Sequence, residues 1–292
     1  MTHYLVTLLS IGGIYLLMAQ ALNFQYGFSG LANFGVVGFF AIGAYCSAIL
    51  TLHGLPIVFG VIAGAMLAGV LGVIISTLCL GLRSDYLAIV TLGFSEAVRI
   101  TAVSEEWLTQ GTRGLAGVPT MALPWLSTNV ASAVIIVLAN IVVFFGLILL
   151  IKSPFGRTIR AVRDDEVALE AVGKMPLAFK RRVFALGSAV IGMSGALYAH
   201  YTSYISPDQF LPLTTFYVWI AIIMGGAGRL SGPLLGTLIL TLFLEGSRFL
   251  RDFVTGISEV EMASLRFAII GAGLIALAVW RPQGLIGDYT KK

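Results

Sequence analysis

Residues 152–182 read KSPFGRTIRAVRDDEVALEAVGKMPLAFKRR and separate two long apolar runs, Asn129–Ile151 and Val183–Ile205. The segment holds eight of the eighteen Lys and Arg residues of the chain, together with four acids. An apolar run of about 20 residues is long enough to cross the hydrocarbon core of a bilayer as a helix. The segment is therefore expected to connect two membrane-spanning helices and to present a charged surface on one side of the membrane.

The composition of the whole chain places it in the bilayer. Charged residues make up 11% of its 292 residues, against roughly 25% in soluble domains, while apolar residues make up 58%. A soluble fold of this length needs more polar surface. The net charge of +4 does not point to nucleic acid, because the cations fall in loops where the positive-inside rule expects them.

Apolar runs of spanning length recur along the sequence and predict an all-α polytopic membrane protein with about nine transmembrane segments. The run 28–52 is rich in Gly and is expected to be broken or re-entrant, and the run 213–250 is too long for one span and is interrupted by GGAGRLSGP at 225–233. We treat 1–292 as a single transmembrane domain. The runs are Tyr4–Leu22, Phe28–Leu52, Pro56–Leu80, Tyr86–Val103, Asn129–Ile151, Val183–Ile205, the two parts of Leu213–Leu250, and Met262–Trp280.

The distribution of charge orients these spans. Short loops rich in Lys and Arg stay cytoplasmic, which places 152–182 and the C-terminal residues in the cytoplasm. The opposite side then receives 104–128, Asp208 and 251–261, where acids match or outnumber Arg. With nine crossings the N-terminus is predicted to lie outside, although its first spans carry no charge that would fix it.

The charged loop contains its own helix signals. Ser153 followed by Pro154 is typical of an N-cap and a first helical position. The acids Asp164–Glu166 suit the first turn of a helix, and Gly173 suits the position that closes one. We expect a partly amphipathic helix of about ten residues, which is marginal alone in water and should pack against something. It is either a coupling helix that fits a soluble partner or a solvated loop that only fixes the topology.

Several segments, taken in order, resemble the LivM-type permease subunits of bacterial branched-chain amino acid ABC importers. Residues 84–94 (SDYLAIVTLGF) are similar to a family stretch, as is the loop 156–173. The resemblance covers nearly the whole chain. Shorter matches are GALYA at 195–199, ISP at 205–207, GG at 225–226 with GP at 232–233, and RPQGL at 281–285.

The resemblance implies the partners: a second, related permease, two cytoplasmic ATPase subunits and a periplasmic binding protein, in the inner membrane of a bacterium. No G-x-x-x-x-G-K-[ST] occurs in this chain, so ATP and Mg²⁺ are expected on the partner subunits and no cofactor in this one. The residues expected to contact the ATPase are Gly156, Arg157, Arg160, Arg163, Asp164, Asp165, Glu166, Glu170 and Gly173.

Two family segments differ in this chain. The external TGGPNGL-like segment appears as TQGTRGL at 109–115, and the GQLSLGHA-like segment as GLANFGV at 30–36. The implied substrate is a branched-chain or other hydrophobic amino acid. Urea, short amides and aromatic acids stay open as alternatives.

Polar residues inside the apolar runs are the candidates for the translocation pathway. Gln20 is followed by a group of amides and hydroxyls that either line a pathway or satisfy the backbone of a broken helix. Glu96 lies three residues from Arg99, so the two can also neutralise each other on one helix face. The pathway candidates are Asn23, Gln25, Ser29, Asn33, Asp85, Tyr86 and Glu96.

Small residues spaced four apart mark helix faces that can approach closely. Two such faces lie next to Pro56 and Pro233, in opposite halves of the chain, and indicate either plain packing or an internal repeat of the kind found in transporters. The glycines are Gly60, Gly64 and Gly72 in the first half, and Gly228, Gly232 and Gly236 in the second.

Other function classes find little support. His3, His53 and His200 are scattered and give no metal-binding or catalytic motif, so we expect neither an enzyme nor a metal site. A self-sufficient secondary transporter or channel needs ionisable coupling residues in the membrane, and these are sparse. A scaffold without a pore predicts no transport defect when the Gly faces are enlarged.

Overall fold

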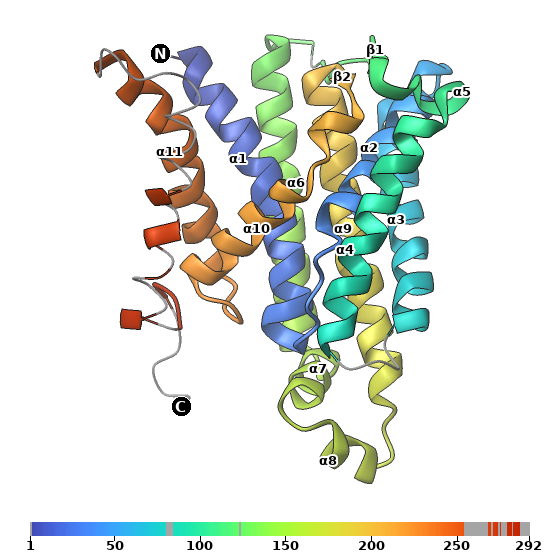
Figure 1. Cartoon of the computed structure of the whole chain (residues 1–292), viewed down its shortest axis with the longest axis vertical. Helices are drawn as coiled ribbons and strands as arrows, with labels where there is room; N and C mark the ends of the chain where they lie inside the picture. The colour runs from blue at the N-terminus through green and yellow to red at the C-terminus, as the bar shows by residue number, and fades with distance from the viewer. Residues whose placement is uncertain are drawn as a thin grey trace.

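A computed structural model describes residues 2–79, 84–122 and 124–253, with short parts of 268–286. The described chain is a bundle of long helices (Figure 1). The long helices are α1 (Thr2–Leu22), α2 (Val36–Leu52), α3 (Ile57–Cys79), α4 (Ser84–Ser104), α6 (Thr128–Lys152), α9 (Pro176–Thr202), α10 (Pro212–Gly225) and α11 (Gly232–Phe253). The short elements are η1 (Asn23–Gly27), α5 (Glu106–Thr109), η2 (Gly111–Arg113), β1 (Leu115–Ala116), α7 (Pro154–Asp164), α8 (Glu166–Ala171), β2 (Tyr204–Ile205) and η3 (Pro207–Gln209).

The all-α polytopic architecture is confirmed. Within the described residues, six helical segments are long and apolar enough to cross a membrane, and two shorter apolar helices, Val36–Leu52 and Gly232–Glu245, accompany them. The ninth expected span, Met262–Trp280, lies largely outside the described residues, so the full count stays a prediction. The six are Tyr4–Gly27, Ile57–Cys79, Tyr86–Ser104, Thr128–Lys152, Pro176–Thr202 and Pro207–Gly225.

The helix that follows the charged loop starts earlier than predicted. It begins at Pro176 rather than Val183, so Lys180–Arg182 belong to α9 and not to the loop. Pro176 occupies the first helical turn, where its missing N–H costs nothing. Lys180 pairs with Glu166 of the loop, while Arg181 and Arg182 are exposed, so the first turns of the helix are charged. Hydropathy alone therefore placed the start of the helix too late.

The predicted break in the run 28–52 is confirmed. Residues 30–35 are not helical and lead into α2 at Val36, and Gly30 adopts a φ of 75° that favours glycine. Irregular backbone inside a membrane bundle needs side-chain partners. The Thr91 hydroxyl accepts from the Phe34 N–H at 3.0 Å, and the Thr215 hydroxyl accepts from the Val37 N–H at 3.1 Å. The broken segment is thus held by α4 and α10.

The two ends of the bundle differ in structure. At one end β1 pairs antiparallel with β2, Leu115 opposite Ile205, beside α5 and η2; α7 and α8 protrude at the other end (Figure 1). His200 is buried near the first end, where its Nδ1 lies 2.8 Å from the Pro119 carbonyl and its Nε2 2.8 Å from the Ser47 hydroxyl. Because a carbonyl only accepts, Nδ1 donates and Nε2 accepts. His200 therefore ties the 114–122 segment to α2 and α9.

The order of helices repeats with opposite direction. In Figure 1, α1 runs toward the α7–α8 end, α2 returns and α3 descends, while α9, α10 and α11 run up, down and up. The middle helices are the shortest of each set, at 17 and 14 residues. A Cβ on Gly64 would lie 2.7 Å from the Gly43 carbonyl between α3 and α2, and one on Gly232 would lie 2.0 Å from the Gly226 carbonyl between α11 and α10. Successive helices of the bundle alternate in direction, so this order is compatible with an inverted repeat and equally with plain packing; the repeat stays a prediction.

Candidate functional site

The loop that protrudes from the bundle starts with a tight reversal after α6. The Ser153 hydroxyl accepts from the Gly156 N–H at 3.4 Å, and Pro154 takes the first turn of α7. A Cβ on Gly156 would lie 2.1 Å from the Ile151 carbonyl oxygen, so only glycine permits this approach. The predicted helix start at Ser153 and Pro154 is confirmed, and α7 is folded back against the end of α6.

The rest of the loop forms a second helix that is shorter than expected. Asp165 has an extended backbone, so the acids are divided: Asp164 ends α7 and Glu166 begins α8. The Asp165 carboxylate caps α8 by accepting from the Ala168 N–H at 3.0 Å. Gly173, with a φ of 76°, follows the end of α8 as predicted. The helix expected between the acids and Gly173 is therefore present as α8, but the expected length of about ten residues is wrong: with Asp165 as its cap, α8 has six residues.

Three charged side chains of the loop face the protein itself. Arg160 donates to the Ile151 carbonyl at 3.1 Å and to the Gly156 carbonyl at 3.2 Å. Glu166 accepts from Lys180 of α9 at 2.5 Å. Arg163 donates to the carbonyl of Gly27, at the end of η1. These residues hold the loop against α6, α9 and η1.

Arg163 belongs to a contact that joins three parts of the bundle. Its guanidinium also lies beside Gly228, in the connection between α10 and α11. Asn23 completes the contact, since its Oδ1 accepts from the Gly228 N–H at 2.8 Å and its Nδ2 donates to the Arg229 carbonyl at 2.8 Å. We call Arg163, Asn23, Gly27 and Gly228 the coupling node. It connects α7 with the end of α1 and with the 226–231 connection.

Other loop residues face outward. The predicted contact residues Arg157, Asp164 and Glu170 are exposed. Three apolar side chains beside them are also exposed: Val167 by 75%, Val172 by 70% and Met175 by 76%. Large apolar side chains exposed next to charges at the tip of a loop are typical of a protein–protein contact. We call Val167, Val172 and Met175, with these charged neighbours, the loop tip.

The polar cluster at the end of α1 is fully buried. Gln25 donates to the Phe184 carbonyl of α9 at 2.9 Å and accepts from Asn33 Nδ2 at 2.9 Å. Ser29 donates to the Gln25 carbonyl at 2.6 Å, and Asn33 Oδ1 accepts from the Gly35 N–H at 2.8 Å. The cluster thus supports the backbone of the broken segment, the second of the two predicted roles. In this conformation it offers no free surface, and its part in the pathway stays a prediction.

The other pathway candidates lie on α4. Glu96 and Arg99 form an ion pair in which both carboxylate oxygens accept from the guanidinium, and both side chains are partly exposed. Tyr86 is exposed, whereas the side chain of Asp85 lies outside the described residues. The pair neutralises itself, as the three-residue spacing allowed. The structure does not bring the α4 residues together with the Gln25 cluster.

The predicted packing glycines lie at helix contacts. A Cβ on Gly60 would lie 2.7 Å from the Ser47 hydroxyl, and one on Gly72 would lie 2.8 Å from Ser188. A Cβ on Gly236 would lie 1.8 Å from the Ala221 carbonyl, while Gly228, with a φ of 84°, belongs to the coupling node. At Gly236 the two backbones lie closer than a side chain permits, and at Gly60 and Gly72 a side chain of the neighbouring helix occupies the space that a Cβ would need.

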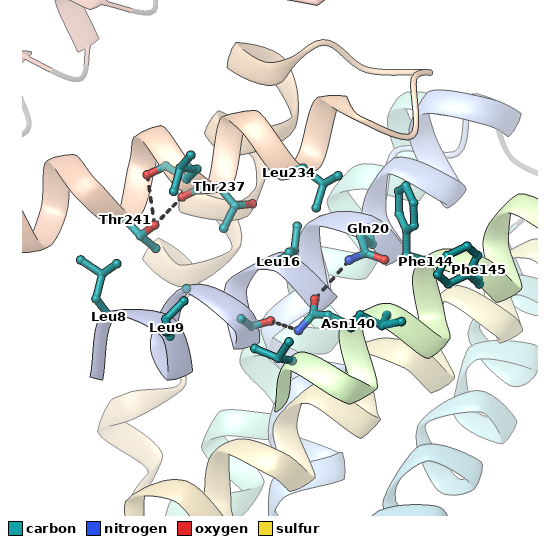
Figure 2. A pocket seen from close by; sticks show the side chains of 15 residues that line it. Leu8, Leu9, Leu16, Gln20, Asn140, Phe144, Phe145, Leu234, Thr237 and Thr241 are labelled. Carbon is teal, nitrogen blue, oxygen red and sulfur yellow. Dashed lines mark hydrogen bonds between the residues drawn. The ribbon is translucent and has the colours of Figure 1, made fainter. Parts of the chain in front are cut away.

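A polar group that sequence analysis did not single out lies between α1, α6 and α11. Asn140 lies in the middle of the apolar run of α6, and its Oδ1 accepts from Gln20 at 3.1 Å (Figure 2). An amide in the middle of an otherwise apolar span was the signal that could have identified it. In the described part of the chain, no three His, Cys, Asp or Glu residues gather in a way that would hold a metal ion.

Comparisons with known proteins agree on one family. Residues 4–279 match the family described as the permease component of the branched-chain amino acid transport system. The chain is 30% identical to the high-affinity branched-chain amino acid transport system permease protein LivM of Escherichia coli, over 94% of this chain and 68% of that protein. It is 27% identical to a probable LivM of Methanocaldococcus jannaschii, over 94% and 91%. It is also 24% identical to the permease LivH of Salmonella typhimurium, over 79% and 80%. No solved structure is significantly similar to the chain.

Proposed function

Because this chain belongs to the family of branched-chain amino acid transport permeases, we propose that it forms half of the translocation pore of an ABC importer. Its substrates are branched-chain or other hydrophobic amino acids, delivered by a periplasmic binding protein. Two cytoplasmic ATPase subunits drive transport, and a second homologous permease completes the pore. The chain itself binds neither ATP nor Mg²⁺.

The loop tip carries this proposal. It lies beyond the ends of the spanning helices (Figure 1) and combines exposed apolar side chains with charges of both signs. Such a surface suits the cleft of a soluble partner. The basic residues of 152–182 favour the cytoplasm for this end, where ATP is available. The C-terminus then lies on the same side after nine crossings.

The coupling node supplies a route for the motion. Arg163 is held by α7 but bonds to the end of η1 and lies beside the connection between α10 and α11. A displacement of α7 by an ATPase therefore moves α1 and the α10–α11 hairpin as well as the directly linked α6 and α9. Because these helices belong to opposite halves of the chain, their relative motion opens the pathway to alternating sides.

The first experiment is a mild-detergent purification of the intact assembly from its native membrane. We expect an ATPase and a second permease to co-purify with this chain. Replacing Val172 with Asp should greatly reduce recovery of the ATPase, whereas Trp107→Asp, equally exposed but at the opposite end of the bundle, should not. Recovery of the chain alone, active in vesicles without ATP, would refute the proposal.

The node is tested separately in reconstituted importer. Arg163→Ala should leave the ATPase bound but abolish uptake, because the ATPase motion no longer reaches η1 and the 226–231 connection. ATP hydrolysis should then cease to respond to the loaded binding protein. Normal uptake by this variant would show that the node does not transmit the motion, while leaving the ATPase contact itself intact.

A further inference from the structure

A groove runs along the membrane-spanning surface between α6 and α11, with α1 as its floor (Figure 2). It encloses a cavity of about 450 Å³. Gly13 brings α1 against Ile136 of α6, and Gly12 brings α1 against Thr241 of α11. The cavity lies between these two contact lines. Its rim consists of exposed apolar side chains, among them Ile141, Phe145 and Leu238.

Two buried polar atoms in the groove have no hydrogen-bond partner within the described chain. They are Gln20 Oε1 and Thr237 Oγ1, on residues that are 3% and 2% exposed. Gln20 uses its amide nitrogen to donate to Asn140, so its carbonyl oxygen is left over. A buried unpaired polar atom is costly in any apolar medium, and more so where no water is available. The groove is therefore incomplete without an occupant that bears a hydrogen-bond donor.

The depth of Gln20 in the membrane distinguishes between the possible occupants of the groove. It lies about 10 Å along the helix from Gly27, which is the residue that contacts Arg163 at the cytoplasmic end. A lipid offers only hydrocarbon at that depth and leaves the amide oxygen unpaired. A membrane-spanning helix with a Ser, Thr, Asn or Gln side chain offers the donor, and such interhelical hydrogen bonds are common in membrane bundles.

The shape of the groove also suits a helix. On α1 the cavity extends from Leu8 to Gln20, about 18 Å of helix. The two walls stand on separate helices, so a helix laid along α1 would pack against both of them.

We propose that this groove receives a membrane-spanning helix of the second permease subunit, whose hydroxyl or amide side chain donates to Gln20 Oε1. The inference rests on the proposed function, because it requires a permease partner. The relatives supply that partner: Salmonella typhimurium has both a LivM and a LivH permease, and each resembles this chain. The interface between the two permeases thus includes α1, α6 and α11.

Cross-linking in native membranes tests the contact directly. A photoreactive amino acid at Ile141, on the rim, should form an adduct with the second permease, identified by mass. The same amino acid at Val142, the next residue of α6 and also exposed but outside the groove, should not. An adduct from Ile141 only with lipid, with a second copy of this chain, or within the same chain would overturn the proposal.

Substitutions measure the energetics of the contact. Ile141→Trp fills the groove and should lower recovery of the second permease about tenfold, whereas Val142→Trp should leave it unchanged. Thr237→Val removes a hydroxyl that bonds nothing in the described chain and should lower recovery about threefold, the effect of one interhelical hydrogen bond. Equal recovery from all three variants would refute the groove as the interface.

The outcomes separate this inference from the proposed function. If no second permease co-purifies with the unmodified chain, the proposed function fails. If it co-purifies but neither cross-links at Ile141 nor responds to Ile141→Trp, the importer assignment stands and only the location of the interface is wrong.

Discussion

The contact between α3 and α9 and the contact between α1 and α11 each join a helix of the first half of the chain to one of the second, yet only the first is closed. On the α3–α9 side, a Cβ on Gly192 would lie 2.4 Å from Ala68 Cβ and 2.9 Å from the Gly64 carbonyl. On the α1–α11 side, a Cβ on Gly12 would make only ordinary contact with Thr241, at 3.4 Å. The groove runs along this contact and is lined by α1 from Leu8 to Gln20 and by α11 from Leu234 to Thr241.

The two contacts differ in the size of the side chains that line them. Where small residues line both helices, van der Waals packing completes the contact within the chain. Where α11 presents leucines and threonines instead, the helices stay apart and leave Gln20 and Thr237 incompletely bonded. The closed side needs no partner for its stability, whereas the open side gains from one.

The largest expected effect comes from forcing the closed contact apart. Gly192→Leu should lower the free energy of unfolding by about 3 kcal/mol or more, because the side chain meets backbone and Ala68 rather than flexible atoms. The thermal midpoint of the chain in detergent measures this loss. Gly146→Leu in α6, where an added Cβ meets nothing within 4 Å, is the control. Equal losses from both variants would contradict the comparison.

Substitutions of the buried amides Gln25 and Gln20 should have an intermediate effect on the free energy of unfolding. Gln25→Leu should cost about 2 kcal/mol, because it leaves Asn33 Nδ2 buried without its acceptor. Gln20→Leu should cost about 1 kcal/mol in the isolated chain, since it leaves Asn140 Oδ1 without its donor but also removes the unpaired Gln20 oxygen. Chemical unfolding of the two variants in the same detergent compares them. A greater loss of stability from Gln20→Leu than from Gln25→Leu would show that the polar atoms of the groove already have hydrogen-bond partners within the chain.

Alanine substitutions at Gly72 and Gly12 should have the smallest effects on stability, and the two variants are the most closely matched pair. Gly72→Ala places a Cβ 2.8 Å from Ser188 Cβ and should destabilise by about 1 kcal/mol. Gly12→Ala meets only ordinary contacts and should be neutral or stabilise by up to about 1 kcal/mol through helix propensity. We expect Gly72→Ala to lower the melting temperature relative to the parent chain, and Gly12→Ala to leave it unchanged or raise it. A loss of stability from Gly12→Ala as large as that from Gly72→Ala would mean that both contacts are closed.

Much of the fold followed from local sequence. The spans of α3 and α6 are apolar over a full bilayer thickness, so hydropathy located them within a few residues. The Gly-rich run 28–52 predicted the break before α2, and Ser153 with Pro154 located the start of α7. The start of α9 was missed because hydropathy does not register a helix whose first turns are basic. The length of α8 was overestimated because Asp165 acts as a cap rather than as a first-turn acid.

The roles of individual polar residues were less predictable. The sequence left Gln25 and Asn33 with two possible roles, since their partners lie far away in the chain, as Phe184 does for Gln25. Arg163 was grouped with the ATPase contacts, but its hydrogen bond points to Gly27. A periodic pattern reports which face of a helix is apolar, and does not report which helix will cover that face.

The sequence by itself determined that this protein is an all-α membrane permease, because spanning length and family motifs are local properties of the chain. It also determined where the charged loop lies in the chain. Only the tertiary structure decided that Arg163, Asn23 and Gly228 meet at one node. It also decided that the contact between α3 and α9 is closed while the contact between α1 and α11 is open. Those features depend on which backbones approach each other, and that is set by the packing of residues distant in sequence.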